Sequence, residues 1–429
     1  RKSYKISLFV CDFGGKHSAD FERQLQMLPP RDSLPVQTLH STAALPAVPP
    51  GAVVVDALFG SGLTRPLEGP WAEMIAFLHD LPNEILAIDL PSGLFADRHT
   101  AGPCVRARRV FSFETPKLAF FMPENAASVG DWAFGSIGLH PEYAAQTDTP
   151  FTYLTADAFH LRARHKFDHK GTYGHALLIA GSYGKMGAAV LAAKAALRAG
   201  AGLVTVHAPA CGGAILQTAV PEAMFSADRR AKLWSAAPDL GPYRSIGLGC
   251  GLGLAPETAT AMEALLDRAQ SPLVLDADAL NLLAAHPAWW AKIPQNSLLT
   301  PHPKEFERLF GPSKNDFERL ELLRAQAATR GVYIILKGAH TAIAGPDGRC
   351  RFNSTGNPGM ATAGAGDVLT GILTGLLAQG YTPEDAGCLG VYLHGLAGDL
   401  AANRYSRPGM TAGSIAASLG AAWNTLENV

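Results

Sequence analysis

Cysteine is scarce in this chain and is nowhere concentrated. Its 429 residues include six cysteines, and no two of them stand in a C-x-x-C spacing. Such pairs form most structural zinc sites, and a denser cysteine framework is needed for a disulfide-stapled fold. The scattered cysteines therefore argue against both classes and favour a reducing compartment, so we expect a cytoplasmic protein.

An excess of charge is missing as well, and so are long hydrophobic runs. The chain has 36 lysines and arginines against 37 aspartates and glutamates, a formal net charge of −1, and no block of like charge. A nucleic-acid or anionic-membrane surface would need a basic stripe, so we expect neither partner. No uninterrupted apolar stretch reaches the roughly 18–20 residues of a membrane span.

The first residues lack an initiator methionine and lack the features of a signal peptide. The opening RKSYKISLFV is too short and too polar for one, and it begins directly on a strand-like alternation. We therefore expect the chain to be a fragment whose true start is missing.

The chain does contain an alternation of strand-like and helix-like segments, and this alternation occurs in each of two halves. A content of 48% hydrophobic and 17% charged residues is typical of globular proteins, and the length is too great for one ordinary core. The polar stretch PEYAAQTDTP, residues 141–150, has no apolar period and predicts a domain boundary. We expect two doubly wound α/β domains, at residues 1–145 and 151–429.

Several strand-like runs end in Asp, Gly or Ser, and open α/β sheets bind ligands at the carboxyl ends of their strands. A Pro-Asp-Gly turn within residues 340–352 predicts a β-hairpin. Two helical stretches, from 366 to about 379 and from about 383 to 404, are expected to close the chain. The expected strands lie within residues 4–10, 51–60, 84–93, 175–182, 203–209, 245–253, 272–280, 296–306 and 332–338.

The stretch NPGMATAGAGDVLTGIL, residues 357–373, places Asp367 at the start of an apolar helical period. The nine residues before this aspartate include three glycines, three alanines and a threonine. A helix cap would explain the aspartate alone. The small neighbours are better explained by the close approach of a phosphate to free N–H groups at the helix start. We therefore predict an anion site with Asp367 beside it.

Four further residues admit both a structural and a functional interpretation. Asp276 and Asp278 stand two apart and are expected on one face of a strand end, where they either cap a helix or act near Mg²⁺ or substrate. His302 lies between two prolines on a stiff loop, and by itself is an ordinary surface histidine. Lys185 lies in a glycine-rich turn that is neither a dinucleotide fingerprint nor a Walker A motif, so ligand approach and helix packing both remain open.

Taken together, five stretches resemble the ADP-dependent NAD(P)H-hydrate dehydratase family, whose fold is ribokinase-like. They occur in family order from about residue 151 to the end: HKGTYGHALLIAGS, LDADALNLL, TPHPKEFERL, LKGAHT and NPGMATAGAGDVLTGIL. The first domain is similar to the Rossmann-like NAD(P)H-hydrate epimerase that bacteria often fuse ahead of the dehydratase, through DALFGSGLTRP, DLPSGLFAD and FETPK. The whole chain thus resembles a bifunctional nicotinamide-nucleotide repair enzyme.

In the second domain, the resemblance implies that Asp367 is the catalytic base and contacts the hydrated substrate, and that Gly366 contacts the adenine nucleotide. Further substrate contacts are implied for Ala188, Gly251 and His302. The implied nucleotide-binding turn consists of Lys337, Gly338, Ala339, His340 and Thr341.

In the first domain, the resemblance implies potassium ligands at Asp56 and Ser92 and a substrate contact at Asp89. One departure concerns an Asn-Gly-Gly-Asp loop that the family carries upstream of the strand matched by residues 4–10, and that supplies a further potassium-site asparagine. FGGKHS (13–18) follows that strand and lacks the asparagine, so we expect an incomplete epimerase site, either because residues were lost or because this half is a scaffold. The remaining implied substrate contacts are Gly60, Ser61, Gly62, Leu63, Thr64, Arg65 and Pro66.

The implied reaction restores a hydrated nicotinamide ring. The C6 hydroxyl is phosphorylated at the expense of ADP, which gives AMP, and phosphate then leaves; Asp367 would accept the hydroxyl proton while the helix start and Mg²⁺ stabilise the phosphoryl charge. The epimerase half would interconvert the two C6 epimers. The implied cofactors are ADP, Mg²⁺ and K⁺, the implied partners are NAD(P)H hydrates and an adenine nucleotide, and we expect a homo-oligomer.

Two alternatives stay open. One is a kinase of the same fold that acts on a small molecule such as a vitamin precursor, since such kinases share the Gly-Ala-Gly-Asp element. The other is a non-catalytic nucleotide-binding module.

Overall fold

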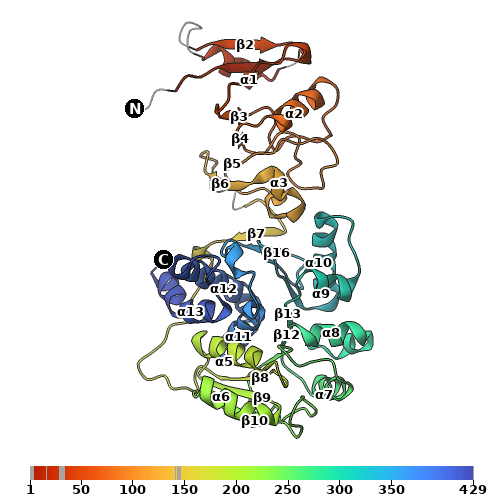
Figure 1. The fold of residues 1–429 in the computed structure, drawn as a ribbon, viewed down its shortest axis with the longest axis vertical. Helices are drawn as coiled ribbons and strands as arrows, with labels where there is room; N and C mark the ends of the chain where they lie inside the picture. The colour runs from red at the N-terminus through yellow and green to blue at the C-terminus, as the bar shows by residue number, and fades with distance from the viewer. Residues whose placement is uncertain (1–3, 16, 29–33, 141, 143–145, 429) are drawn as a thin grey trace. The chain divides into compact units, whose positions relative to one another are not determined.

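The computed structural model describes residues 4–15, 17–28, 34–140, 142 and 146–428. Its chain divides into two compact units (Figure 1). Unit 1 comprises Arg1–Thr147 with Asn315–Phe317, and unit 2 comprises Asp148–Lys314 with Glu318–Val429. Among the described helices, none combines the length and the hydropathy that a bilayer span requires.

Unit 1 contains parallel strands in two sheets. A two-stranded sheet pairs β1 (Leu8–Cys11) with β2 (Val36–Leu39). A four-stranded sheet has the order β3-β4-β5-β6, with β3 at Val54–Asp56, β4 at Ile85–Ile88, β5 at Arg109–Phe113 and β6 at Asp131–Gly135. The helices are α1 (Ala19–Gln26), α2 (Pro70–Asp80) and α3 (Ala126–Val129).

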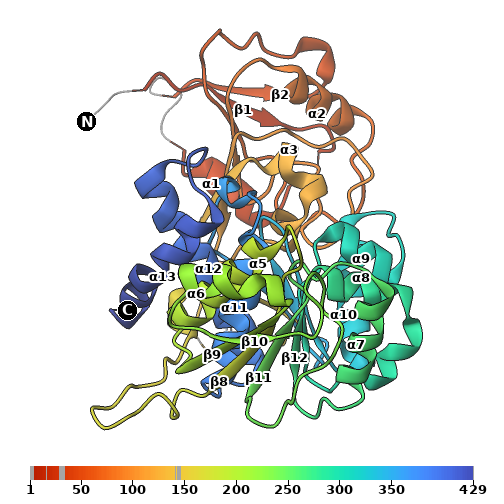
Figure 2. The same ribbon diagram turned by 60° about the horizontal axis from the view of Figure 1, so that its bottom comes forward.

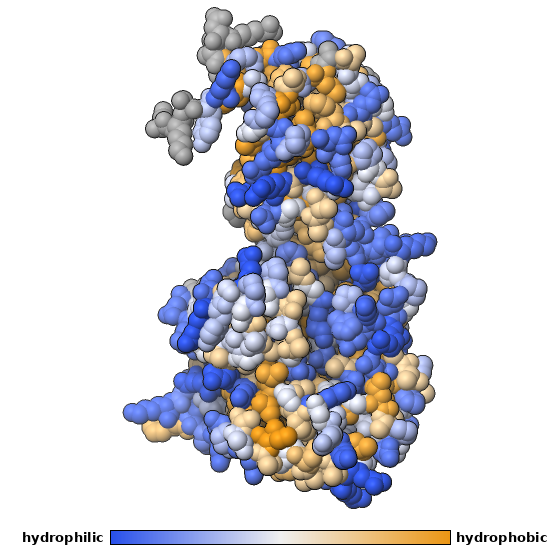
Figure 3. All heavy atoms as spheres, in the orientation of Figure 1, coloured by the Kyte–Doolittle hydropathy of each residue, from blue (hydrophilic) through white to orange (hydrophobic). Residues whose placement is uncertain are grey.

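The parallel strands of unit 1 agree with the expected α/β class, but they do not join into one sheet. Within the described residues, β1 pairs only with β2, and β3 pairs only with β4. Hydrophobic residues reach the surface of this unit (Figure 3). The exposed large side chains include Val55 of β3 and Phe111 of β5. The four-stranded sheet nevertheless presents the carboxyl ends of β3 and β4 at one edge, where the first site lies.

Unit 2 is built on a ten-stranded sheet of order β10-β9-β8-β11-β12-β13-β14-β15-β16-β7. From β8 the chain moves outward through β9 to β10, and then returns to the other side of β8 to place β11 through β14. The point between β8 and β11 is therefore the switch point at which such sheets bind ligands. The strands are β7 (Phe151–Leu154), β8 (His175–Ile179), β9 (Leu203–Ala208), β10 (Met224–Ala227), β11 (Ser245–Leu248), β12 (Leu273–Leu275), β13 (Leu298–Leu299), β14 (Tyr333–Leu336), β15 (Ala342–Ala344) and β16 (Cys350–Asn353).

Helices cover both faces of this sheet, as the doubly wound prediction requires. In Figures 1 and 2, α7 to α10 lie on one side of the strands and α5, α6 and α11 to α13 on the other. The helices are α5 (Met186–Arg198), α6 (Gly213–Ala219), α7 (Pro256–Leu266), α8 (Asp278–Ala285), α9 (Pro303–Phe310), α10 (Asp316–Arg330), α11 (Ala365–Ala378), α12 (Pro383–Tyr405) and α13 (Ala412–Glu427).

The end of the chain confirms three sequence predictions and adds one helix. The expected hairpin is the antiparallel pair β15–β16, and the two expected closing helices are α11 and α12. Helix α13 was not predicted, because its sequence AGSIAASLGAAW is rich in small residues and its apolar period has little contrast. It nevertheless packs into the main core through Ile415 and Leu419, both fully buried.

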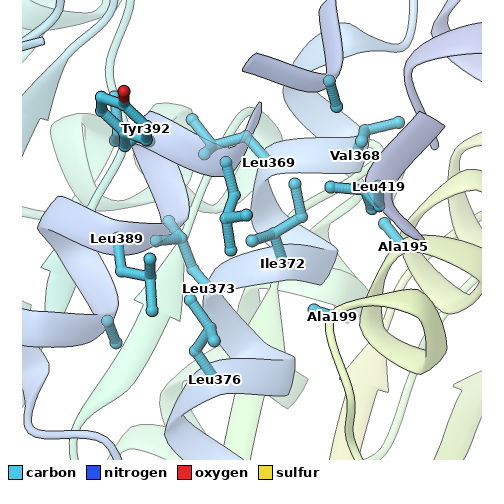
Figure 4. Close-up of a cluster of buried hydrophobic side chains, with 14 of the residues drawn as sticks. Ala195, Ala199, Val368, Leu369, Ile372, Leu373, Leu376, Leu389, Tyr392 and Leu419 are labelled. Atoms are coloured by element: carbon cyan, nitrogen blue, oxygen red, sulfur yellow. The ribbon is translucent and has the colours of Figure 1, made fainter. Parts of the chain in front are cut away.

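Helix α11 lies unusually close to α5, and small residues on both helices allow this. Figure 4 shows Ala195 of α5 and Ala199, the C-cap of that helix, facing the apolar side chains of α11. A Cβ added at Gly375 would lie 2.7 Å from the carbonyl oxygen of Ala196, and one added at Gly371 would collide with the carbonyl oxygen of Ala192. The two backbones can therefore approach only because α11 carries glycines where it crosses α5.

We expect Gly371→Ala to lower the free energy of unfolding of unit 2 by about 1–3 kcal/mol, because the new methyl group overpacks this contact. The matched control is Gly420→Ala on the exposed side of α13, where no described atom lies within 4 Å of the added Cβ. That change should be neutral or stabilising by up to about 1 kcal/mol, since alanine is the better helix former. The measurement is the midpoint of urea unfolding, and equal midpoints for the two variants would contradict the packing account.

Candidate active sites

The site of unit 2 forms where five neighbouring parallel strands end. The loops after β8, β11, β12, β13 and β14 meet the first turn of α11 at this edge of the sheet. They are tied together by backbone bonds such as that from Gly181 N to Cys250 O, 2.7 Å, and by the Ser182 hydroxyl, which donates to Gly251 O at 2.8 Å. The side chains that follow these strands are therefore held on a rigid scaffold.

A buried ion pair lies at the centre of the site. The Lys337 ammonium lies 2.8 Å from Asp276 Oδ1, and the Thr370 hydroxyl of α11 donates to Asp276 Oδ2 at 2.9 Å. Burial by itself raises the pKa of Asp276, but Lys337 and the hydroxyls of Thr300 and Thr370 outweigh it and lower that pKa. Burial likewise opposes the charge on Lys337, yet Asp276 and Glu305 raise the pKa of its ammonium. Both partners are charged at neutral pH.

Asp367 stands in the first turn of α11, half-buried beside this pair. Burial, the largest effect, and the nearby Asp276 carboxylate both raise the pKa of Asp367. The hydrogen bond from the Cys250 thiol and the charge of Lys337 lower that pKa, but the net change is a rise. Asp367 is therefore a stronger base than an ordinary aspartate, while Asp276 is held ionised. The two carboxylates share one site and have opposite environments.

Glycine occupies two positions just before Asp367, with a different physical reason at each. Gly364 is the N-cap of α11 and adopts φ +89°, and a Cβ there would also collide with Leu191. A Cβ on Gly366 would lie 3.4 Å from Asp276 Oδ2 and 3.5 Å from Lys337 Nζ. The helix start is thus bare of side chains beside a lysine ammonium, as the predicted anion site requires.

His302 is held by helix capping. It is the N-cap of α9, where its Nδ1 accepts from the N–H groups of Lys304 (3.2 Å) and Glu305 (3.3 Å), and the Glu305 carboxylate accepts from His302 N at 2.9 Å. Because Nδ1 accepts, a neutral imidazole carries its proton on Nε2. Glu305 lies 3.5 Å from His302 Nε2 and 3.8 Å from Lys337 Nζ, so it links the histidine to the central ion pair.

The glycine-rich turn after β8 brings two implied substrate contacts together. A Cβ on Gly251, at φ +65°, would lie 3.2 Å from the Ala188 Cβ and 3.1 Å from Lys185 O. The Lys185 ammonium lies 3.7 Å from Asp278 Oδ2, which also accepts from Gly253 N at 2.8 Å. Lys185 and Asp278 therefore close the turn by an ion pair.

The expected placement of Asp276 and Asp278 on one strand face is wrong. Ala277 between them has φ +48° and breaks the strand, so that Asp276 directly follows β12 while Asp278 begins α8. Neither carboxylate caps the helix, whose N-cap Ala277 offers no side-chain acceptor. The strained backbone aims the two carboxylates at different lysines.

Among the described residues of the implied nucleotide-binding turn, only Lys337 forms ion pairs with site carboxylates, those of Asp276 and Glu305. Gly338 and Thr341 close the turn, since the Thr341 hydroxyl donates to Gly338 O at 3.2 Å. Burial lowers the pKa of His340, so this imidazole is neutral at neutral pH. Ala339 lies between them at the exposed side of the turn.

A second site lies in unit 1, at the ends of β3 and β4. The Ser92 hydroxyl donates to Asp56 Oδ1 at 2.6 Å and Ser92 N donates to Asp56 Oδ2 at 2.7 Å. Burial raises the pKa of Asp56 despite these bonds. Phe59 N donates to the Ser92 hydroxyl oxygen at 2.9 Å, which holds the start of the loop 60–66 over the pair.

Asp89 of unit 1 has the opposite environment. It adopts φ +67° directly after β4, accepts from Ser61 N at 3.1 Å, and lies 3.0 Å from Lys117 Nζ. Burial acts to raise the pKa of Asp89, but Lys117 and the backbone donors of Ser61 and Phe113 together lower it. A Cβ on Gly60 would lie 2.9 Å from Asp89 Oδ2, so the loop 60–66 can cross this carboxylate only with glycine there.

Sequence reasoning missed several residues of both sites. Lys117, Thr370 and Cys250 contact predicted carboxylates, and Glu305 lies beside Lys337 and His302, yet none of the four was identified as a site residue. Lys117 lies in FETPK and Glu305 in TPHPKEFERL, so the motifs were found while their partners were not. Their roles depend on contacts between strands distant in sequence, and no spacing rule reports those.

A family model described as NAD(P)H-hydrate dehydratase matches residues 176–420, and one described as YjeF-related protein N-terminus matches residues 1–119. A protein of Moorella thermoacetica called bifunctional NAD(P)H-hydrate repair enzyme Nnr is 40% identical over 376 residues, which cover 85% of this chain and 71% of that protein. The protein of that name from Escherichia coli K12 is 34% identical over 371 residues, covering 86% and 70%.

A solved structure matches unit 2. It is the ADP/ATP-dependent NAD(P)H-hydrate dehydratase of Bacillus subtilis, co-crystallised with ATP and Mg²⁺. The match has 35% identity and a TM-score of 0.57, and covers 64% of this chain and 98% of the other.

We expect Lys337→Met to lower the free energy of unfolding of unit 2 by about 3–5 kcal/mol at pH 7, because it leaves Asp276 buried and unpaired. The contribution of the pair is present at neutral pH; it is lost as pH falls through the lowered pKa of Asp276 or rises through the raised pKa of Lys337. Adding Asp276→Asn should recover part of the loss.

The control for this change is Lys292→Met, whose ammonium pairs with Glu263 and Asp267 at the surface. That substitution should cost no more than about 1 kcal/mol. Urea unfolding at pH 7 measures both variants. A cost for Lys337→Met as small as that of the control would show that the central pair is not the anchor of the site.

Proposed function

The chain belongs to the family of bifunctional NAD(P)H-hydrate repair enzymes, and we propose how its two units divide the repair of hydrated nicotinamide nucleotides. Unit 2 dehydrates the (6S)-hydrate of NADH or NADPH at the expense of ADP and releases AMP and phosphate. Unit 1 carries the residues implied for interconversion of the R and S hydrates, except the potassium-site asparagine that FGGKHS (13–18) lacks; with that asparagine supplied, both epimers become available for dehydration. The order of the two family matches along the chain supports this division.

The observation that carries the dehydratase assignment is the position of Asp367. Its carboxylate is half-buried, its pKa is raised, and it stands at a helix start that is bare of side chains. In the proposed reaction Asp367 takes the proton of the C6 hydroxyl as that oxygen forms a bond to the terminal phosphorus of ADP, while the bond to the AMP oxygen breaks. Phosphate then leaves with the C6–O electron pair, and loss of a proton from C5 re-forms the ring double bond.

The start of α11 and Lys337 stabilise the charge of the transferred group. The first N–H groups of an α-helix have no partner within the helix, and here glycine at positions 364 and 366 leaves them open. Lys337 Nζ would lie 3.5 Å from a Cβ on Gly366, so its ammonium faces the same space. This geometry supports the proposed nucleotide contacts of Gly366 and of the turn from Lys337 through Gly338, Ala339, His340 and Thr341.

The hydrate itself is proposed to lie against the turn after β8. Ala188 and Gly251 form one small-residue surface there, and its lack of bulk leaves room for the hydrated ring. His302 presents an Nε2–H on the neighbouring loop, so it would donate to a substrate oxygen. In unit 1, the loop 60–66 and Asp89 form the corresponding substrate contacts.

We propose one metal ion for each unit, Mg²⁺ with the nucleotide in unit 2 and K⁺ in unit 1. The described residues contain no group of three His, Cys, Asp or Glu side chains fit to hold a metal. Magnesium, present with ATP in the Bacillus subtilis crystals, would therefore be held mainly by the phosphates of the nucleotide, where it neutralises their charge. Potassium suits the oxygen donors of Asp56 and Ser92, because Asp56 is a buried carboxylate with only neutral partners; a bound cation there would offset its charge.

The direct test is to incubate the full chain with NADH hydrate and ADP, and to follow the return of reduced-nicotinamide absorbance. Recovery that requires the nucleotide and yields AMP and phosphate is the expected result. Phosphorylation of a small alcohol without any recovery would instead identify a kinase of the same fold. Binding without turnover would identify a nucleotide-binding module.

We expect Asp367→Asn to lower kcat for dehydration by about 10²–10⁴-fold, since it removes the general base. Because the pKa of Asp367 is raised, wild-type activity should fall at a pH above that of an ordinary aspartate as the base is protonated. The control is Asp347→Asn in the β15–β16 turn, where the carboxylate pairs with Arg351. A wild-type rate in Asp367→Asn would refute the assigned role.

We expect Lys117→Met to lower the rate of epimerisation at least about tenfold, because Asp89 loses the cation that lowers its pKa. The acid limb of the epimerisation profile should move to higher pH. Dehydration of purified S hydrate by the same preparation is the internal control and should be unchanged. Equal loss of both activities would indicate general damage to the chain instead.

A further inference from the structure

A cavity of about 360 Å³ opens at the edge of unit 2 opposite the proposed dehydratase site. It lies where β8 and β11 begin: Arg162 and Arg164 precede β8, Arg244 precedes β11, and Gln379 follows the last turn of α11. Arg244 N donates to His175 O at 2.9 Å, which joins the two strand starts. None of these residues takes part in the functions proposed above.

Three arginine side chains converge on the cavity. Arg162 Nη1 and Arg244 Nη2 each lie 2.6 Å from the position that a Cβ would take on Gly380, so both guanidinium groups face one point. Arg164 Nη2 donates to Gly200 O at 2.7 Å and to Gln379 Oε1 at 3.1 Å. The Arg164 guanidinium also lies 4.0 Å from the centre of the Tyr173 ring, which fixes its plane.

The positive charge of this cluster is not balanced by the described part of the chain. No described carboxylate pairs with any of the three arginines, and the one acid of the lining, Asp168, accepts instead from Tyr173 Oη and His165 N, both at 2.7 Å. The same segment, residues 162–170, adds two lysines. It projects from unit 2 as the loop between β7 and β8 in Figure 2, and the region is coloured mostly as hydrophilic in Figure 3.

Arginines that face one another without a carboxylate repel each other, and an anion placed between them removes that repulsion. The planar guanidinium group presents paired N–H donors that match the oxygens of a phosphate group. Arg162 and Arg164 are already oriented by carbonyl oxygens of Gln379 and Gly200, so little ordering is left for binding to supply.

We propose that Arg162, Arg164 and Arg244 form a second phosphoanion site, separate from the nucleotide site at the start of α11. Its ligand is either a free inorganic phosphate or pyrophosphate, or the diphosphate group of an adenine nucleotide. The site does not depend on the proposed repair reaction.

The test is calorimetric titration of the full chain with inorganic pyrophosphate, without Mg²⁺ and at constant ionic strength. We expect Arg244→Gln to raise the dissociation constant at least tenfold; Arg244 forms no side-chain hydrogen bond to the described residues, so its loss should leave the fold intact. The charge-matched control, Arg404→Gln at the end of α12, should bind as the wild type does. Arg162→Gln provides an independent second variant on the same cavity.

Titration with ADP distinguishes the two sources of the ligand. Two ADP sites in the wild type and one in Arg244→Gln would identify a nucleotide, whereas one ADP site in both, with pyrophosphate binding lost in the variant, would identify a free anion. Pyrophosphate binding that is absent, or unchanged in both Arg244→Gln and Arg162→Gln, would overturn the proposal. Dehydration of NADH hydrate by the same variants is read separately, so failure here leaves the repair function untouched.

Discussion

The contact between α5 and α11 sets the geometry on which the rest of unit 2 depends. Glycines on α11 allow its backbone to rest against the carbonyl groups of α5, while the opposite side of α11 fills the core with branched side chains (Figure 4). Once α11 is seated, its first turn carries Asp367 to the switch point of the sheet, and Thr370 one turn later reaches the buried Asp276. The helix therefore packs the core and positions the site with the same stretch of chain.

Charge is arranged by one scheme in both units. Each site contains a carboxylate that a lysine holds ionised, Asp276 with Lys337 and Asp89 with Lys117. Each also contains a carboxylate whose pKa burial raises, Asp367 and Asp56. A pair of acids with separated pKa values lets one group keep its charge while the other takes a proton or a cation. The two units reach this arrangement on different sheets, at the carboxyl ends of parallel strands in each case.

Strained backbone marks the same places. Two residues other than glycine adopt positive φ in the sites: Asp89, itself a site carboxylate, and Ala277, which follows Asp276. Gly364 does so at the start of α11. Such conformations cost free energy and persist where the surrounding contacts determine them. At Ala277 the reversal separates Asp276 from Asp278 and gives each its own lysine. A periodic sequence pattern assumes regular backbone, so the expectation that both aspartates share a strand face failed at this residue.

The sequence by itself determined the α/β class, the helix that begins just before Asp367 and the hairpin at the Pro-Asp-Gly turn, because these follow from local period and turn chemistry. It missed β2, β5, β6, β7 and β10, which are short strands whose pairing depends on their neighbours in the sheet. Its motifs also identified the family. Only the tertiary structure decided that Lys337 pairs with Asp276, that Glu305 joins it to His302, and that Lys117 holds Asp89, since each contact joins loops from different strands. It also decided the directions of the carboxylate pKa shifts, because burial and neighbouring charge exist only once the strands are assembled.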